Sequence, residues 1–385
     1  MSFENDLGNI NENFFFREFT YSSNKFKPNR KTEYELADSV VWLDEFLMVV
    51  QVKERFPSFG ATIQDEENWF KNEVLQKATE QIGNTLRYLN TYDSITLTNR
   101  QGHEFNLANA KEKKIHKLII HKSESKLPLE LASQKFQDDP IAGIVHIVES
   151  DDYLGILQTL ITPSEVQQYL SFREILIKEW SDVVSGVPEH ALVGQFLRNL
   201  PEEHPSLKFL YFLTVLQQKA KDTDEWDISR IIHLFPQRRS TPQKVPTDYY
   251  RILKELAKLN RTDMGLFKER FKKSMEVAEA DKNVLPYRFD ATTGCGFLFI
   301  PLPRSEESNK IKILEALTAL NKYDRRLSIC LGLSFLFDGG TPPCDVHWCR
   351  LEHPWVENAR LAALLKEQAY FRPIKESVVE RYGLE

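Results

Sequence analysis

The sequence predicts a mixed α/β (α+β) protein, and three observations lead to this class. Between Glu35 and Arg55, two apolar runs meet at Asp44-Glu45, a pattern typical of a β-hairpin. From residue 151 to about residue 283, apolar residues recur with helical spacing. After residue 297, short apolar strands alternate with helical segments, which indicates a small C-terminal α/β module.

The length of the chain indicates more than one domain. A chain of 385 residues exceeds the usual size of a single hydrophobic core. We expect one domain at 1–150 with the hairpin, a helical domain at 151–290, and the α/β module at 291–385. The module suits a role in partner binding or regulation, but its sequence specifies no ligand.

The hairpin carries three polar residues at its open end. A turn at Asp44-Glu45 pairs Asp38 with Gln51, and Lys53 follows on the same face because side chains alternate along a strand. An acid, an amide oxygen and an ammonium group are costly to bury without partners, and a divalent cation would supply one. The alternative is a plain cross-strand ion pair between Asp38 and Lys53, because such charges also occur in purely structural networks.

The elements around the hairpin complete a mixed sheet with helices. Asn13–Tyr21 has the pattern of an amphipathic helix, and Trp69–Leu89 that of a longer one that includes Gln81. The predicted strands that follow are 94–98, 104–107, 115–121 and 141–148.

This order of elements resembles the PD-(D/E)xK nuclease superfamily. The relevant segments are Glu-Leu-Ala-Asp at 35–38, Gln-Val-Lys-Glu-Arg at 51–55, Trp-Phe-Lys at 69–71 and Ala-Thr-Glu-Gln at 78–81. They are also similar to a group of bacterial nuclease-like proteins associated with mobile or defence loci. The resemblance covers roughly the first 150 residues, a usual domain size, and implies a restriction-endonuclease-like mixed sheet flanked by helices.

The resemblance implies a role for each polar residue. Asp38 would be the metal-binding acid, Gln51 the second ligand through its amide oxygen, and Lys53 the residue that orients or activates the attacking water. Gln81 would face the site from the helix. Gln51 departs from the superfamily pattern, which usually has Asp or Glu there, so a weaker hold on the metal is expected.

An additional acid is expected near this site, and two residues compete for the role. Glu35 is slightly favoured over Glu18, although strand alternation turns Glu35 away from Asp38 unless the strand begins near Leu36.

The function implied by the resemblance is metal-dependent DNA cleavage. With Mg²⁺ or Mn²⁺ as cofactor, such a site hydrolyses phosphodiester bonds. The resemblance implies a role in bacterial defence against phage or plasmid DNA, and a partner protein of the same system is a candidate. One alternative is a nucleic-acid-binding or scaffold subunit whose site has decayed, and another is an RNase.

Composition limits the other possibilities. The net charge of −6 indicates that DNA contacts would come from local basic clusters, and the candidates are 111–117, 238–244 and 268–273. No apolar run reaches the ~18 residues of a membrane span, and the chain starts with polar residues, so we expect a cytoplasmic protein. Motifs for nucleotide binding, zinc proteolysis and serine hydrolysis are absent from the sequence.

The cysteines all occur late in the chain, as Cys295, Cys330, Cys344 and Cys349, and are expected to be reduced thiols. A strand at 345–353 would place Asp345, His347, Cys349 and His353 on one face, so a zinc site is conceivable. The spacing matches no standard zinc site, and ordinary packing is the favoured interpretation.

Overall fold

The computed structural model describes residues 2–22, 25–27, 33–56, 61–123, 126–219, 227–234, 246–340, 344–373 and 382. The chain divides into two compact units, Met1–Lys219 and Ala220–Gly383. Of the helices between residues 151 and 290, those up to Lys219 belong to the first unit and the later ones to the second.

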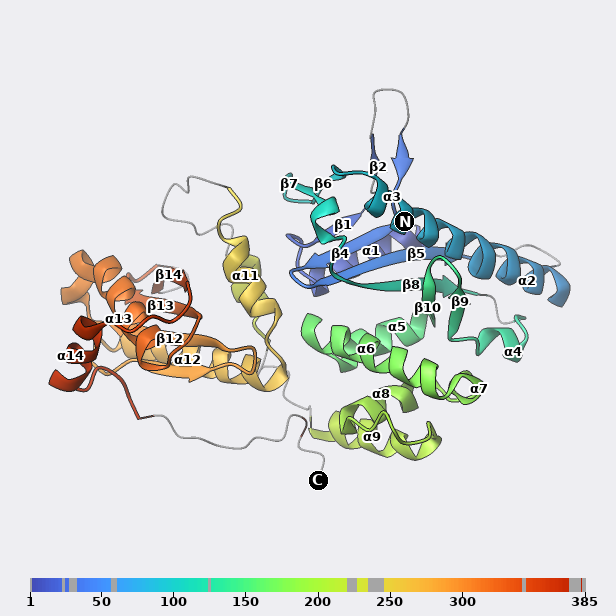
Figure 1. Cartoon of the computed structure of the whole chain (residues 1–385). Helices are drawn as coiled ribbons and strands as arrows, with labels where there is room; N and C mark the ends of the chain where they lie inside the picture. The colour runs from blue at the N-terminus through green and yellow to red at the C-terminus, as the bar shows by residue number, and fades with distance from the viewer. Residues whose placement is uncertain are drawn as a thin grey trace. The chain divides into compact units, whose positions relative to one another are not determined.

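The first unit is built on a six-stranded mixed sheet in the order β1-β4-β5-β8-β10-β9 (Figure 1). Strands β5, β8 and β10 are parallel, and the other pairs are antiparallel. The strands are β1 (Thr20–Ser22), β4 (Ser39–Leu43), β5 (Phe46–Glu54), β8 (Lys114–Lys122), β9 (Phe136–Asp139) and β10 (Gly143–Glu149). Two short ribbons lie outside this sheet: β2 (Lys25–Phe26) with β3 (Tyr34–Glu35), and β6 (Thr96–Thr98) with β7 (Glu104–Asn106).

Helices cover both faces of this sheet (Figure 1). One face packs against a continuous helical stretch of three parts: α2 (Ile63–Trp69), the π-helical η1 (Phe70–Ala78) and α3 (Thr79–Thr91). Its core includes Val40, Val49, Val74 and Ile82. The other face packs against α1 (Phe3–Phe14) and α5 (Ser150–Thr159). The unit also contains η2 (Leu107–Ala110), α4 (Leu129–Ala132), α6 (Pro163–Glu179), α7 (Ser181–Val184), α8 (Glu189–Arg198), η3 (Leu207–Phe209) and α9 (Leu210–Lys219).

The predicted helix at Asn13–Tyr21 is wrong. The helix is α1, which ends at Phe14, and Phe16 has a positive φ of 68° that an α-helix cannot contain. The chain then enters β1, where Thr20 pairs with Val41. Phe15, Phe16 and Phe19 are buried between α1 and β1, so the apolar spacing of this segment arises from core packing rather than from a helix.

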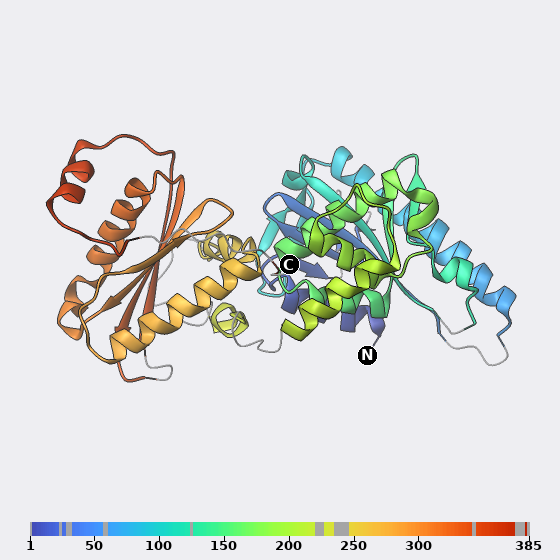
Figure 2. The ribbon, with the colours of Figure 1, turned by 90° about the horizontal axis from the view of Figure 1, so that it is seen from below.

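The second unit is a four-stranded sheet in the order β11-β12-β13-β14. Its strands are β11 (Tyr287–Asp290), β12 (Cys295–Leu302), β13 (Ile329–Phe337) and β14 (Cys344–Glu352). Figure 2 shows α12 (Arg261–Glu279) along one face of the sheet and α13 (Lys310–Asp324) on the other. Phe267 of α12 contacts Phe297 and Phe299, which explains why this helix belongs with the C-terminal sheet. The remaining elements are α10 (Ser229–Leu234), α11 (Tyr250–Ala257), η6 (Arg304–Asn309) and α14 (Ala359–Glu367).

The structure therefore confirms a mixed α/β protein with a mixed sheet flanked by helices. Among the described helices, none is both long and apolar enough to cross a membrane.

Candidate functional site

The hairpin formed by β4 and β5 has the predicted register. Ser39 pairs with Val50 and Val40 with Val49, so Asp38, just before β4, lies opposite Gln51. Asp44 makes the tight turn possible with a φ of 52°, a conformation that Asp tolerates better than most residues. Asp38, Gln51 and Lys53 therefore come together at the open end of the hairpin, on the face that η1 and α3 cover.

The Asp38 carboxylate is held beside β5 by the backbone. Its Oδ2 accepts a hydrogen bond of 2.6 Å from the Val52 N–H. The pKa of Asp38 is raised to about 6, because the effect of burial is larger than the opposite effects of the Val52 hydrogen bond and the Lys53 charge. The charges of Glu4 and Glu35 raise the pKa further. This carboxylate is thus costly to keep ionised unless a cation lies beside it.

Gln51 is buried, with 1% of its surface exposed. Its Oε1 has no hydrogen-bond partner within the described part of the chain. A buried acceptor without a partner costs about 1–3 kcal/mol, so the amide oxygen is available for a ligand. Because Gln51 lies opposite Asp38, the hairpin end offers one amide oxygen and one carboxylate to the same ligand.

Lys53 is fixed by the helix rather than by Asp38. Its Nζ donates a hydrogen bond of 2.7 Å to Oε1 of Gln81 in α3. Among the described residues, Asp38 and Lys53 make no direct ion pair, but the charge of each still acts on the other. Burial lowers the pKa of Lys53, and the charge of Asp38 partly opposes this effect.

The position of Gln81 follows from how α3 packs. Ala78 and Ile82 are completely buried against the sheet, which turns the neighbouring Gln81 towards the hairpin end. One turn later, the Thr85 hydroxyl donates to the carbonyl oxygen of Leu36, just before Asp38. The helix and the start of the hairpin are therefore tied together at the site.

The two candidates for an additional acid lie in different places. Glu35 ends the β2–β3 ribbon with an exposed side chain, and its charge acts on Asp38 and Lys53 without a direct contact. Glu18 precedes β1 and accepts a hydrogen bond from Gln101. Because the strand after Glu18 pairs with β4 from Val41 towards Ser39, Glu18 belongs to the turn end of the hairpin. Of the two acids, only Glu35 lies near the site.

The sequence did not indicate one residue that lies near the site. His121 of β8 pairs with Lys53 in the parallel register, so both side chains point to the same face. It is 1% exposed, its Nδ1 has no partner among the described residues, and burial lowers its pKa to about 4. The alternation of side chains along the predicted strand could have assigned His121 to this face. Its position beside Lys53 follows only from the pairing of β5 with β8 in the structure.

Other predicted sites receive less support. Among the described residues, no group of three or more His, Cys, Asp or Glu side chains could hold a metal ion. This finding also covers the zinc candidates Asp345, His347, Cys349 and His353. Asp345 instead pairs with Lys310 and His347, each at 2.8 Å. The four cysteines are free thiols. The basic cluster at 238–244 lies outside the described residues.

Comparison with known proteins finds no matching family model, curated protein or solved structure.

Proposed function

We propose that the first unit is a divalent-cation-dependent DNA endonuclease of the PD-(D/E)xK type. The observation that carries this proposal is the gathering of three groups at one end of the hairpin: the Asp38 carboxylate, the unpartnered amide oxygen of Gln51 and the ammonium of Lys53. A restriction-endonuclease-like arrangement is supported by the element order: helix, hairpin, helix with Gln81, and parallel strand β8.

Asp38 and Gln51 would hold the cation. Both offer hard oxygen ligands, which suit Mg²⁺ or Mn²⁺, and Mg²⁺ typically binds through one or two carboxylates with water and substrate phosphate completing its shell. When bound, the cation stabilises charge on the phosphate and lowers the pKa of a bound water. The cation would also relieve the cost of the buried Asp38 charge and of the unpartnered Gln51 oxygen.

Lys53 would orient the attacking water at the phosphate. Its hydrogen bond to Gln81 fixes the ammonium in place before any substrate arrives, and such pre-organisation reduces the cost of reaching the reactive geometry. Gln81 is therefore a positioning residue. Glu35 would contribute charge near the site rather than a direct contact.

The proposed biological role is cleavage of phage or plasmid DNA in bacterial defence, together with a partner protein of the same system. This role rests on the similarity of segments 35–38 and 51–55 to defence-associated nucleases.

A scaffold subunit with a decayed site is the second candidate. It is favoured by the small number of acids, because Asp38 alone offers a buried carboxylate at the hairpin end and no group of three metal-binding side chains occurs among the described residues. A decayed site would bind nucleic acid without cutting it.

Cleavage of supercoiled plasmid by the purified protein tests the proposal. We expect cutting with Mg²⁺ or Mn²⁺ and none with EDTA. Asp38→Ala should lose both Mn²⁺ binding and cleavage, because it removes the only charged ligand. Lys53→Ala should still bind Mn²⁺ but cut about 10²–10⁴ times more slowly.

The matched controls are Asp93→Ala and Lys71→Ala, which alter exposed residues of the same unit and should leave cleavage unchanged. Folding of each variant is checked by circular dichroism. Full activity in Lys53→Ala would show that the assigned role is wrong, and absence of cleavage with bound DNA would favour the scaffold. A parallel assay with single-stranded RNA distinguishes a DNase from an RNase.

A further inference from the structure

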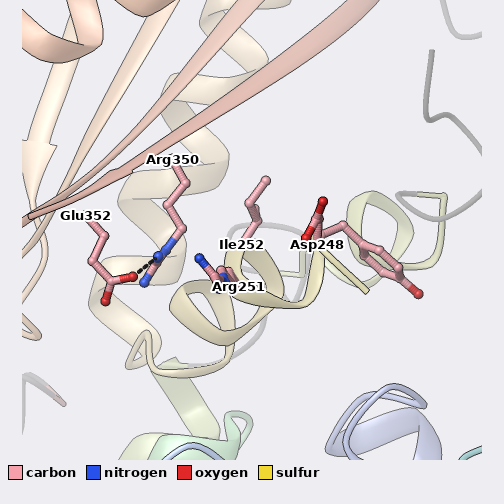
Figure 3. A pocket seen from close by; sticks show the side chains of 6 residues that line it. Asp248, Arg251, Ile252, Arg350 and Glu352 are labelled. Carbon is pink, nitrogen blue, oxygen red and sulfur yellow. Dashed lines mark hydrogen bonds and ion pairs between the residues drawn. The ribbon is translucent and has the colours of Figure 1, made fainter. Parts of the chain in front are cut away.

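The second unit contains a hollow of its own, between α11 and β14. It has a volume of about 450 Å³ and is lined by Asp248, Tyr249, Arg251, Ile252, Arg350 and Glu352. This volume lies within the range typical of small-molecule sites. Figure 3 shows that Arg251 and Arg350 reach this space from different elements and turn their guanidinium groups towards each other.

Arg350 is a pre-positioned cation in this hollow. Its side chain is 12% exposed, and Nη2 donates at 2.8 Å to Glu255, which is 2% exposed. Nη1 donates at 2.5 Å to Glu352. The Nε of Arg350 is buried and has no partner among the described residues. Two carboxylates therefore fix the guanidinium in place.

Arg251 brings a second positive charge. It lies in the first turn of α11 with an exposed side chain, and it makes no ion pair or hydrogen bond with its side chain in the part of the chain that the structure describes. Glu255 and Glu352 already balance the charge of Arg350, so a phosphate in this hollow would be attracted mainly by the charge of Arg251. Arginine is well suited to bind phosphate through paired N–H donors.

The remaining lining residues narrow the class of ligand. Asp248 and Glu352 would repel a bare inorganic anion, but their carboxylates can accept hydrogen bonds from hydroxyl or amino groups. Ile252 adds an apolar wall. A ligand that joins a phosphate to a hydroxyl-bearing group could bind the arginines through its phosphate and the carboxylates through its hydroxyl groups.

We propose that this hollow binds a small phosphate ester such as a mononucleotide, with the phosphate between Arg251 and Arg350 and the sugar hydroxyls near Asp248 or Glu352. The site belongs to the second unit and does not depend on the proposed nuclease activity.

Isothermal titration of the full chain with AMP at low salt tests this proposal. We expect binding with a Kd of about 1 mM or tighter. Adenosine, which lacks the phosphate, and inorganic phosphate, which lacks the sugar, should each bind at least about tenfold more weakly.

The decisive variant is Arg251→Ala, which should weaken AMP binding about tenfold or more. Arg251 is exposed and has no partner among the described residues, so the variant should fold normally. Arg251→Lys keeps the charge but loses the planar fork, and should bind with intermediate affinity. Arg360→Ala, which alters an exposed arginine of α14, is the matched control and should bind like the wild type.

Equal affinity of Arg251→Ala and the wild type for AMP would overturn the proposal. Adenosine that binds as tightly as AMP would refute the arginine–phosphate assignment, and inorganic phosphate that binds as tightly as AMP would refute the ester class. The absence of any AMP binding at concentrations of about 5 mM would also contradict it.

Discussion

At Asp38, a residue proposed to bind a cation lowers the stability of the protein. Its carboxylate is buried enough for its pKa to rise to about 6, and the Val52 N–H and the Lys53 charge do not compensate fully. Gln51, opposite, has a buried oxygen without a partner among the described residues. Both residues cost stability in the metal-free protein, and a bound cation would relieve both costs.

Asp38→Asn should therefore stabilise the metal-free protein at high pH. The folded-state pKa of about 6 exceeds the ordinary 3.8, so the folded protein binds the proton more tightly. The ionised Asp38 therefore lowers the stability of the folded protein fully above about pH 6, and this effect disappears as the pH falls towards 3.8. We expect a gain of about 1–3 kcal/mol in the free energy of unfolding at pH 8, and almost none near pH 4.

Urea unfolding in EDTA at the two pH values checks this prediction. Asp93→Asn, which alters an exposed residue, is the control and should change stability at neither pH. An Asp38→Asn protein that is less stable than wild type at pH 8 would contradict the assigned burial cost.

At the scale of elements, a buried charge network attaches two helices to the sheet of the first unit. Arg173 of α6 is fully buried and donates at 2.8 Å from Nε to Glu189 of α8, and from Nη2 to the Ile147 carbonyl of β10 at 3.0 Å. Lys135 also pairs with Glu189 at 3.1 Å. Burial alone would raise the pKa of Glu189, but Arg173 and Lys135 overcome this effect and hold the pKa well below its usual range.

Glu189→Ala should be strongly destabilising, because it leaves Arg173 buried without its counter-charge. A loss of about 3–5 kcal/mol in the free energy of unfolding is expected, measured by urea denaturation at pH 7. Arg173→Met combined with Glu189→Ala should recover part of this loss. The control is Glu174→Ala, which removes a surface pair with Lys178 and should lower the free energy of unfolding by less than about 1 kcal/mol. If Glu189→Ala lowered it by as little, the buried network would not be important for stability.

The sequence predicted some elements and contacts better than others, for physical reasons. The hairpin register could be predicted because a short turn centred on Asp44-Glu45 fixes which residues of the two apolar runs face each other. The hydrogen bond between Lys53 and Gln81 could not be predicted, because it depends on how α3 packs on the sheet. The buried aromatic residues around Phe16 imitated a helical pattern, which led to the wrong helix at Asn13–Tyr21.

At the scale of the whole molecule, each compact unit has a hydrophobic core of its own. The first core includes Val49 and Ile119 under η1 and α3, and the second includes Leu298 and Leu336 beside α13. In the second unit, α13 approaches β13 closely at Gly332, where an added Cβ would overlap the Thr318 hydroxyl. Local changes in one core should therefore affect that unit first.

Calorimetry of the full chain should resolve two unfolding transitions. Gly332→Ala should lower one of them, since overpacking costs about 1–3 kcal/mol, and Glu189→Ala should lower the other. The two variants thus assign the transitions to the units. A single transition that both variants lower equally would contradict independent cores.

The claim that Asp38 and Gln51 together hold a catalytic cation is tested most directly by Gln51→Glu. This change replaces a neutral oxygen ligand with a charged one, so it should tighten Mg²⁺ binding by at least about 1 kcal/mol, or roughly fivefold. The measurement is the rate of plasmid cleavage against Mg²⁺ concentration for wild type and Gln51→Glu. The account predicts metal-dependent cleavage by both proteins, with half-maximal rate at lower Mg²⁺ in the variant. Absence of cleavage in both, with no change in metal binding, would contradict it and favour the scaffold.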